Sequence, residues 1–109
     1  MGAQDQAVAN NDVGISIFAG EEADAIIELL TEELGDKLRV TDCMTYMKLE
    51  TDVGKIEVKF DDVAEVLGHR FSQGDFQAVF ASYYGRPSLL DDRMVVSTDM
   101  SVGVTDQMG

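Results

Sequence analysis

The sequence has one cysteine, one histidine, one proline and no tryptophan in 109 residues, and these shortages exclude several classes of protein. The single thiol, Cys43, has no partner for an internal disulfide, which suits a reducing cytoplasm rather than a disulfide-stapled secreted domain. One histidine and one cysteine supply neither a zinc ligand set nor, with scattered carboxylates, the spacing of an EF-hand. No apolar run approaches the roughly 18 residues of a membrane span, and the N-terminus lacks the pattern of a secretory signal. We therefore expect a cytoplasmic protein without a metal site.

Basic residues are also scarce: 8 lysines and arginines stand against 21 acidic residues, for a net charge of −13. Phosphate backbones and anionic membrane surfaces are bound by clustered basic side chains, so nucleic acid and membrane are both poor partners. The charge suits a basic docking surface on another protein, where it would steer the encounter. It equally suits a protein that uses charge only to stay soluble.

Catalytic groups are sparse as well. His69 is the only histidine, and no nucleophile or orienting group accompanies it in the sequence. The acidic pairs Asp61-Asp62 and Asp91-Asp92 are explained by helix capping and by a turn, and glycine-rich phosphate loops are absent. The chain does not resemble an enzyme. Two alternatives stay open, namely a small hydrolase or isomerase that uses His69, and a regulatory domain with a small-molecule cavity between sheet and helices.

Hydrophobic periodicity predicts a small single α+β domain, in which short antiparallel β-sheets pack against about three helices. Residues 1–11 and 99–109 are expected to be flexible tails, and residues 12–98 form the domain. Helical spacing of apolar residues from Glu21 to Leu34 predicts the main helix, which ends at Gly35. Alternation predicts strands at 13–18, 37–42, 46–49, 55–60 and 93–98.

Residues 60–86 are predicted to form two short helices and a loop. Asp61 or Asp62 is expected to cap the first helix, and Gly68 to end it in a left-handed conformation. Ser72 and Asp75 have the spacing of a capping box for the second helix.

The second helix is expected to carry an apolar stripe and to lead into an exposed loop. Phe71 and Phe76 have the spacing of a hydrophobic staple across its start. The stripe continues to Tyr83, the helix runs out at 82–85, and 86–88 is expected to be a turn.

The loop itself, Tyr83-Tyr84-Gly85-Arg86, combines the residue types that are enriched at interface hot spots. Alternatively, the two residues have structural roles, in which Tyr83 completes the apolar stripe of the core and Arg86 pairs with a nearby acid. For the loop as a unit we favour an interaction surface.

Several segments, in this order, resemble the small effector (coupling, or regulatory) proteins of bacterial soluble multicomponent di-iron monooxygenases, which act on toluene, phenol, alkenes or methane. The likeness covers roughly residues 10–98. It rests on Asn10-Asn11-Asp12-Val13-Gly14, Ala19-Gly20, Val40-Thr41-Asp42 leading to Tyr46, Gly54-Lys55-Ile56, Leu67-Gly68-His69-Arg70-Phe71 and Ser82-Tyr83-Tyr84-Gly85-Arg86.

This resemblance implies a protein with no active site and no cofactor of its own. Such proteins bind the hydroxylase component over the helices around its di-iron centre, and they couple electron input to oxygen activation and to hydrocarbon hydroxylation or epoxidation. They compete or coordinate there with the reductase or ferredoxin component, and the iron, flavin and iron–sulfur groups belong to the partner components.

The resemblance also implies which residues meet the hydroxylase. The segment 79–84 is expected near the hydroxylase active-site region, and the segment 10–14 is expected to take part in docking. The partner-binding residues expected on this basis are Asn10, Asn11, Val13, Gly14, Phe76, Val79, Phe80, Ala81, Ser82, Tyr83, Tyr84, Gly85 and Arg86.

Overall fold

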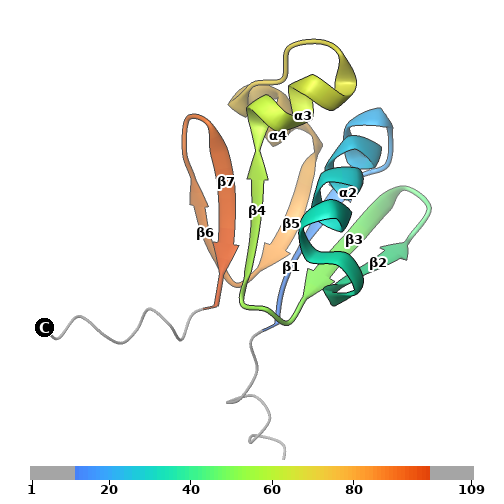
Figure 1. Ribbon diagram of the computed structural model, residues 1–109, viewed down its shortest axis with the longest axis vertical. Coiled ribbons are helices and arrows are strands. Elements are labelled where there is room, and N and C mark those ends of the chain that lie inside the picture. Colours follow the sequence, from blue (N-terminus) through green and yellow to red (C-terminus); the bar gives the residue numbers. More distant parts are fainter. Residues whose placement is uncertain (1–11, 99–109) are drawn as a thin grey trace, which may run out of the picture.

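Two antiparallel sheets and three α-helices make up residues 12–98, the part of the chain that the computed structural model describes (Figure 1). The expected α+β class is confirmed, with short antiparallel sheets and three helices. The two expected tails, 1–11 and 99–109, lie outside the described residues. No helix within 12–98 has the length and apolar character needed to cross a membrane.

The first sheet has the strand order β2-β3-β1-β5. Its strands are β1 (Val13–Phe18), β2 (Leu38–Asp42), β3 (Tyr46–Thr51) and β5 (Phe80–Tyr84). Because β1 pairs with β3 on one side and β5 on the other, it is a central strand, and five of its six residues are buried. The predicted strands at 13–18, 37–42 and 46–49 are confirmed, and β5 was not anticipated.

The second sheet has the strand order β4-β7-β6. Its strands are β4 (Lys55–Lys59), β6 (Arg86–Leu89) and β7 (Arg93–Ser97). The strands predicted at 55–60 and 93–98 are confirmed within a residue, but the predicted turn at 86–88 is wrong. Residues 86–89 pair with β7 instead, and Pro87 is tolerated because β6 is an edge strand.

The helices are α2 (Glu21–Leu34), followed by the 3₁₀ turn η1 (Gly35–Lys37), α3 (Phe60–Leu67) and α4 (Gln73–Val79). Gly35 follows α2 and Gly68 ends α3 in the left-handed conformation, both as predicted. The predicted cap of α3 by Asp61 or Asp62 is wrong, since the N-cap is Lys59 and no side chain caps it. The two carboxylates lie in the first turn, where they complement the positive end of the helix dipole.

Burial of Phe60 explains why α3 begins early. Strand β4 runs directly into the helix, and the Phe60 side chain is only 2% exposed in the core. Its backbone N–H donates to the carbonyl oxygen of Asp92, 3.0 Å away, so tertiary contacts replace the missing cap.

The start of α4 is confirmed as a capping box. The Asp75 backbone N–H donates to Ser72 Oγ, and the Ser72 backbone N–H donates to the Asp75 carboxylate at 2.9 Å. Phe71 and Phe76 are both buried, and both rings pack on Phe60 with centroids 6.0 and 5.4 Å apart from it. This aromatic cluster fixes the position of the α3–α4 corner.

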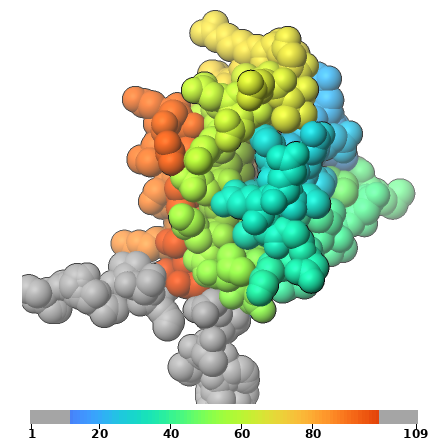
Figure 2. Space-filling model, viewed as in Figure 1, coloured from blue at the N-terminus to red at the C-terminus, as the bar shows by residue number. Residues whose placement is uncertain are grey.

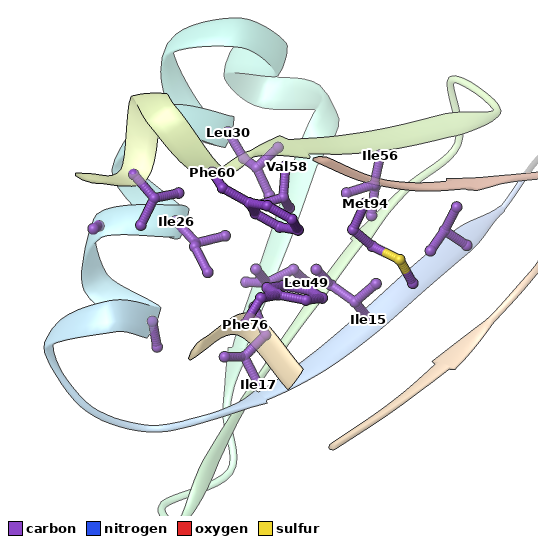
Figure 3. Packing of buried hydrophobic residues seen from close by; sticks show 14 of the residues in the cluster. Ile15, Ile17, Ile26, Leu30, Leu49, Ile56, Val58, Phe60, Phe76 and Met94 are labelled. Atoms are coloured by element: carbon purple, nitrogen blue, oxygen red, sulfur yellow. The ribbon is translucent and has the colours of Figure 1, made fainter. Parts of the chain in front are cut away.

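The core lies between the two sheets and the apolar face of α2 (Figure 3). Figure 3 shows Leu30, Val58 and Phe60 facing Leu49 and Phe76 across it. Among residues 12–98, the sixteen buried apolar residues are Val13, Ile15, Ile17, Ala23, Ala25, Ile26, Leu30, Leu49, Ile56, Val58, Phe60, Val63, Phe71, Phe76, Met94 and Val96.

Gly85 joins the two sheets, because β5 ends one residue before it and β6 begins one residue after it. Its φ is +117°, and a β-carbon placed on it would lie 2.9 Å from the Ser97 carbonyl oxygen and 2.9 Å from Val96 Cγ1. Only glycine allows the backbone to pass this close to β7.

Replacement of Gly85 by alanine should therefore destabilise the protein strongly, by about 3 kcal/mol or more, because an unfavourable φ and a clash with backbone act together. Gly68→Ala is the matched control, since Gly68 also has a positive φ (+81°) but has open space around its Cα. It should cost only about 1–2 kcal/mol. Urea unfolding of both variants measures the difference, and equal losses would contradict the account of Gly85.

A second prediction concerns His69, which lies at the α3–α4 corner. Its Nδ1 is 3.1 Å from the Arg70 carbonyl oxygen and its Nε2 is 3.6 Å from a Glu21 carboxylate oxygen, and these contacts raise the His69 pKa. A raised folded-state pKa stabilises the protein below the unfolded value of about 6.5, and this stabilisation is lost as pH rises through the folded value.

The variant His69→Gln should therefore be less stable than the original protein at pH 5.5 and equal to it at pH 8.5. Urea unfolding at the two pH values provides the measurement. The gap at pH 5.5 should shrink in 1 M salt, because the ion pair is exposed. A gap that grows with pH would refute the assignment.

Candidate interaction surface

The segment predicted to end the second helix is a strand. Helix α4 stops at Val79, and Phe80–Tyr84 forms β5 at the edge of the first sheet, so the predicted continuation of the helix to 82–85 is wrong. Pairing with β1 satisfies the backbone groups on one side of this strand, and aromatic side chains fit the surface of a sheet well. The tyrosines consequently lie on a sheet edge rather than on a helix tip.

A bulge in β5 explains why its apolar residues keep helical spacing. Ser16 of β1 pairs with Ser82, whereas the next residue of β1, Ile17, pairs with Phe80, so Ala81 is an extra residue on β5. In a regular strand, residues three apart point to opposite faces. The bulge brings Phe80 and Tyr83 to the same face, where their rings stack with centroids 5.8 Å apart and an interplanar angle of 12°.

This stack connects the core to the surface. Phe76 is fully buried and stacks on Phe80 at 5.0 Å, Phe80 is half-buried, and Tyr83 at the end of the row is 47% exposed. The prediction that Tyr83 completes the apolar core stripe is thus right in part, because the Tyr83 ring stacks on Phe80 at the end of the row. Its exposed half remains open to a partner.

Tyr84 points to the opposite, outer face of the first sheet. Its ring covers Gly14 of β1, where a β-carbon would lie 2.8 Å from Tyr84 Cζ. Its hydroxyl donates to the Glu50 carboxylate on β3 at 2.6 Å. The ring therefore lies across three strands, and 40% of the residue stays exposed.

Charged groups surround the Tyr84 hydroxyl. Burial, followed by the hydrogen bond and the charge of Glu50, raises the Tyr84 pKa well above its usual range, so the phenol stays protonated. Glu50 also faces Lys48 at 3.8 Å, and Asp12 pairs with Arg39 at 3.5 Å. Both basic and acidic side chains therefore lie near Tyr84, although the chain as a whole is strongly acidic.

The structure distributes the expected partner-binding residues over core and surface. Val13 and Phe76 are fully buried, so they support the surface from below. Ala81, Ser82, Tyr83 and Tyr84 are exposed on β5, and Arg86 is exposed at the start of β6. Asn10 and Asn11 lie outside the described residues, and the remaining four, Gly14, Val79, Phe80 and Gly85, provide the close packing around β5.

The outer face of the first sheet contains a hollow of about 390 Å³, which we call the outer hollow. Sequence reasoning missed five of the residues involved here, namely Ile15, Ser16, Tyr46, Lys48 and Glu50. The alternation of β3 was a usable signal, because Tyr46, Lys48 and Glu50 must share one face of a strand. The outer hollow is lined by Gly14, Ile15, Ser16, Tyr46, Lys48, Ala81, Ser82, Tyr83 and Tyr84.

The described residues offer little for catalysis or metal binding. His69 is exposed, and its ring nitrogens face Arg70 and Glu21 rather than a nucleophile. Cys43 follows β2 in the turn before β3. Within 12–98 no group of three or more His, Cys, Asp or Glu side chains is arranged to hold a metal ion.

A second hollow, of about 340 Å³, lies between α2, β4 and α3, on the face that Figure 2 presents. Leu29 and the buried side chains of Ile26, Leu30 and Val58 form its apolar part. Its polar lining consists of Glu32, Glu33, Glu57, Lys59 and Asp62. A small-molecule-binding regulatory domain, one of the alternatives left open by the sequence, would need a cavity between sheet and helices, and this hollow lies between such elements.

Comparison with known proteins identifies relatives of this fold. A model of the MmoB/DmpM family matches residues 11–97. A chain of the solved phenol hydroxylase–regulatory protein complex superposes with a TM-score of 0.68 at 12% identity, covering 81% of this chain and 99% of that one. The solved regulatory protein B of soluble methane monooxygenase superposes with a TM-score of 0.62 at 23% identity, covering 90% and 72%. No curated protein sequence matches.

The packing of Tyr84 on Gly14 leads to a prediction. In Gly14→Ala the added methyl group should push the ring off β1 and break its hydrogen bond to Glu50, so that the Tyr84 pKa falls toward the ordinary value of about 10. NMR titration of ¹³C-labelled tyrosine measures this pKa. The control is Gly74→Ala, because a β-carbon there has 3.8 Å to its nearest neighbour. An unchanged Tyr84 pKa in Gly14→Ala would contradict the packing.

Proposed function

We infer the role of this protein from its family, because the chain belongs to the MmoB/DmpM family over nearly the whole of residues 12–98. We propose that it is a non-enzymatic effector protein. It binds the hydroxylase component of a soluble di-iron monooxygenase and alters the geometry and access of that component's active site. In this way it couples electron delivery and oxygen activation to the hydroxylation or epoxidation of a hydrocarbon.

The family match carries this proposal, and the nature of the partner follows from the likeness to a chain in a phenol hydroxylase–regulatory protein complex. The protein works in the cytoplasm and brings no cofactor. Iron, flavin and iron–sulfur chemistry belong to the hydroxylase and to the reductase or ferredoxin, with which this protein competes or coordinates for the hydroxylase.

The proposed contact surface centres on β5. Phe80–Tyr84 contains no charged residue, whereas the chain carries a net charge of −13, so this strand can be desolvated at lower cost than most of the surface. Tyr83 and Tyr84 are half-exposed rings whose inner edges are already fixed, by Phe80 in one case and by Gly14 and Glu50 in the other. Rings held in this way lose little freedom on docking, which favours affinity.

The energetic demand on such a surface is modest. An effector shifts a hydroxylase equilibrium only by binding one state more tightly than another. A tenfold shift requires about 1.4 kcal/mol of differential affinity, and an ordinary interface buries about 800 Å² per partner. A contact in which two tyrosines act as hot spots can supply this difference.

The test uses the double variant Tyr83→Ala/Tyr84→Ala with purified hydroxylase and reductase. Because each truncated hot-spot tyrosine costs about 2 kcal/mol, we expect at least tenfold weaker hydroxylase binding, less product per NADH consumed and more peroxide release. Product yield, peroxide and affinity are measured while the ratio of effector to hydroxylase is varied. The original protein should give a rate optimum near equal amounts.

Leu89→Ala/Leu90→Ala is the control, since it removes two exposed apolar side chains, 37% and 48% exposed, from a different edge. It should couple as well as the original protein. If the tyrosine variant is folded and gives normal yield and affinity, the contact surface is wrong. If the original protein neither binds the hydroxylase nor changes its turnover, the proposed function is wrong.

A further inference from the structure

The outer hollow contains a buried hydroxyl group that the fold leaves without a side-chain hydrogen bond. Ser16, on the central strand β1, is 9% exposed, and among the described residues its hydroxyl makes no hydrogen bond. A buried polar group without a partner costs free energy, and native structures rarely keep one without a reason. Because Ser16 lines the outer hollow, a group that enters the hollow can reach this hydroxyl.

The strand register places two further donors beside Ser16. It pairs with Lys48 of β3 on one side and with Ser82 of β5 on the other. Directly paired residues on antiparallel strands project from the same face with Cβ atoms about 5 Å apart. Lys48, Ser16 and Ser82 therefore form a row of an ammonium and two hydroxyl groups across three strands, which we call the donor row.

The ammonium group of the donor row is only weakly engaged. Glu50 is its ion-pair partner, but the distance is 3.8 Å, beyond hydrogen-bonding range, and the same Glu50 oxygen accepts the Tyr84 hydroxyl proton at 2.6 Å. The Lys48 side chain is 43% exposed and lines the outer hollow. With its partner oxygen beyond hydrogen-bonding distance, the ammonium group is available to a second acceptor.

We propose that the donor row binds a side-chain carboxylate, from an aspartate or glutamate of the hydroxylase, when this protein docks. The proposal rests on the proposed function and adds a specific polar contact to it. One cation and two hydroxyl donors suit a singly charged, planar acceptor. A doubly charged phosphate group is disfavoured, because Glu50 lies next to the row and Asp12 lies near Tyr84.

This contact would fix the orientation of docking. On a chain of net charge −13, a carboxylate is repelled from most of the surface, and the donor row is an exception beside the exposed tyrosines. A partner acid that enters the hollow lies next to the Tyr84 ring, because Tyr84 points to the same outer face as Ser16 and Ser82. Electrostatic complementarity of this kind contributes specificity more than bulk affinity.

The test compares Lys48→Gln with Lys55→Gln for binding to purified hydroxylase. The two lysines are matched, because each faces a glutamate two residues further on at 3.8 Å and each lies on a strand, but Lys55 lies in the second sheet. We expect about tenfold weaker binding for Lys48→Gln, a larger loss for Lys48→Glu, and no more than a twofold change for Lys55→Gln. Ser16→Ala should weaken binding severalfold.

A second arm examines the site without the hydroxylase. Sodium acetate, titrated into the ¹⁵N-labelled protein against sodium chloride at equal ionic strength, should shift the Ser16 and Ser82 amide signals, and Lys48→Gln should abolish these shifts. N-methylacetamide, a neutral acceptor, should have no such effect. The proposal is overturned if Lys48→Gln binds the hydroxylase as tightly as Lys55→Gln does. That result would not contradict the proposed effector function. If the original protein fails to bind the hydroxylase, both the effector function and the carboxylate contact are wrong.

Discussion

The pairing of β5 with β1 is the interaction on which the surface of this protein depends. It fixes an aromatic strand beside the most buried strand of the fold, in the register that sets Tyr84 over Gly14 and Ser82 beside Ser16. The bulge at Ala81 then turns Phe80 and Tyr83 together toward the interior face. One strand thus closes the core on one face and builds a polar, tyrosine-lined hollow on the other.

Much of this fold is local in origin and could be predicted from the sequence. The capping box at Ser72 and the left-handed Gly68 involve residues within a few positions of each other, so the spacing carries the information. The strands in which apolar and polar residues alternate could be predicted from the sequence in the same way. The prediction of the α3 N-cap failed because it depends on distant residues. Helix α3 begins early because Phe60 is buried against Phe71 and Phe76, and capping rules consider only residues close in sequence.

The error at β5 has a more specific cause. Phe76, Phe80 and Tyr83 are spaced four and three residues apart, which is the spacing of one helix face. A short helix followed by a strand with one extra residue produces the same set of contacts, because the bulge shifts the alternation by one. The pattern therefore placed these three side chains on a shared face correctly, but it did not identify the backbone that carries them. The polar neighbours of Tyr84 come from β1 and β3, and only the register reveals them.

Edge strands need protection against indiscriminate pairing, and here three of the four edges carry it in their sequences. The strand β2 has Arg39 and Asp42, β4 has Lys55 and Lys59 at its ends, and β6 has Pro87. Strand β5 has neither charge nor proline, and only its bulge interrupts it.

An uncharged aromatic edge exposes a free protein to unwanted strand pairing, but it is an advantage for a protein that must dock. Because Phe80, Gly14 and Glu50 already hold the two tyrosine rings, little of the binding free energy is lost in ordering these rings when a partner docks. The proposed effector function would benefit directly, since an effector influences its partner only through a difference between binding free energies.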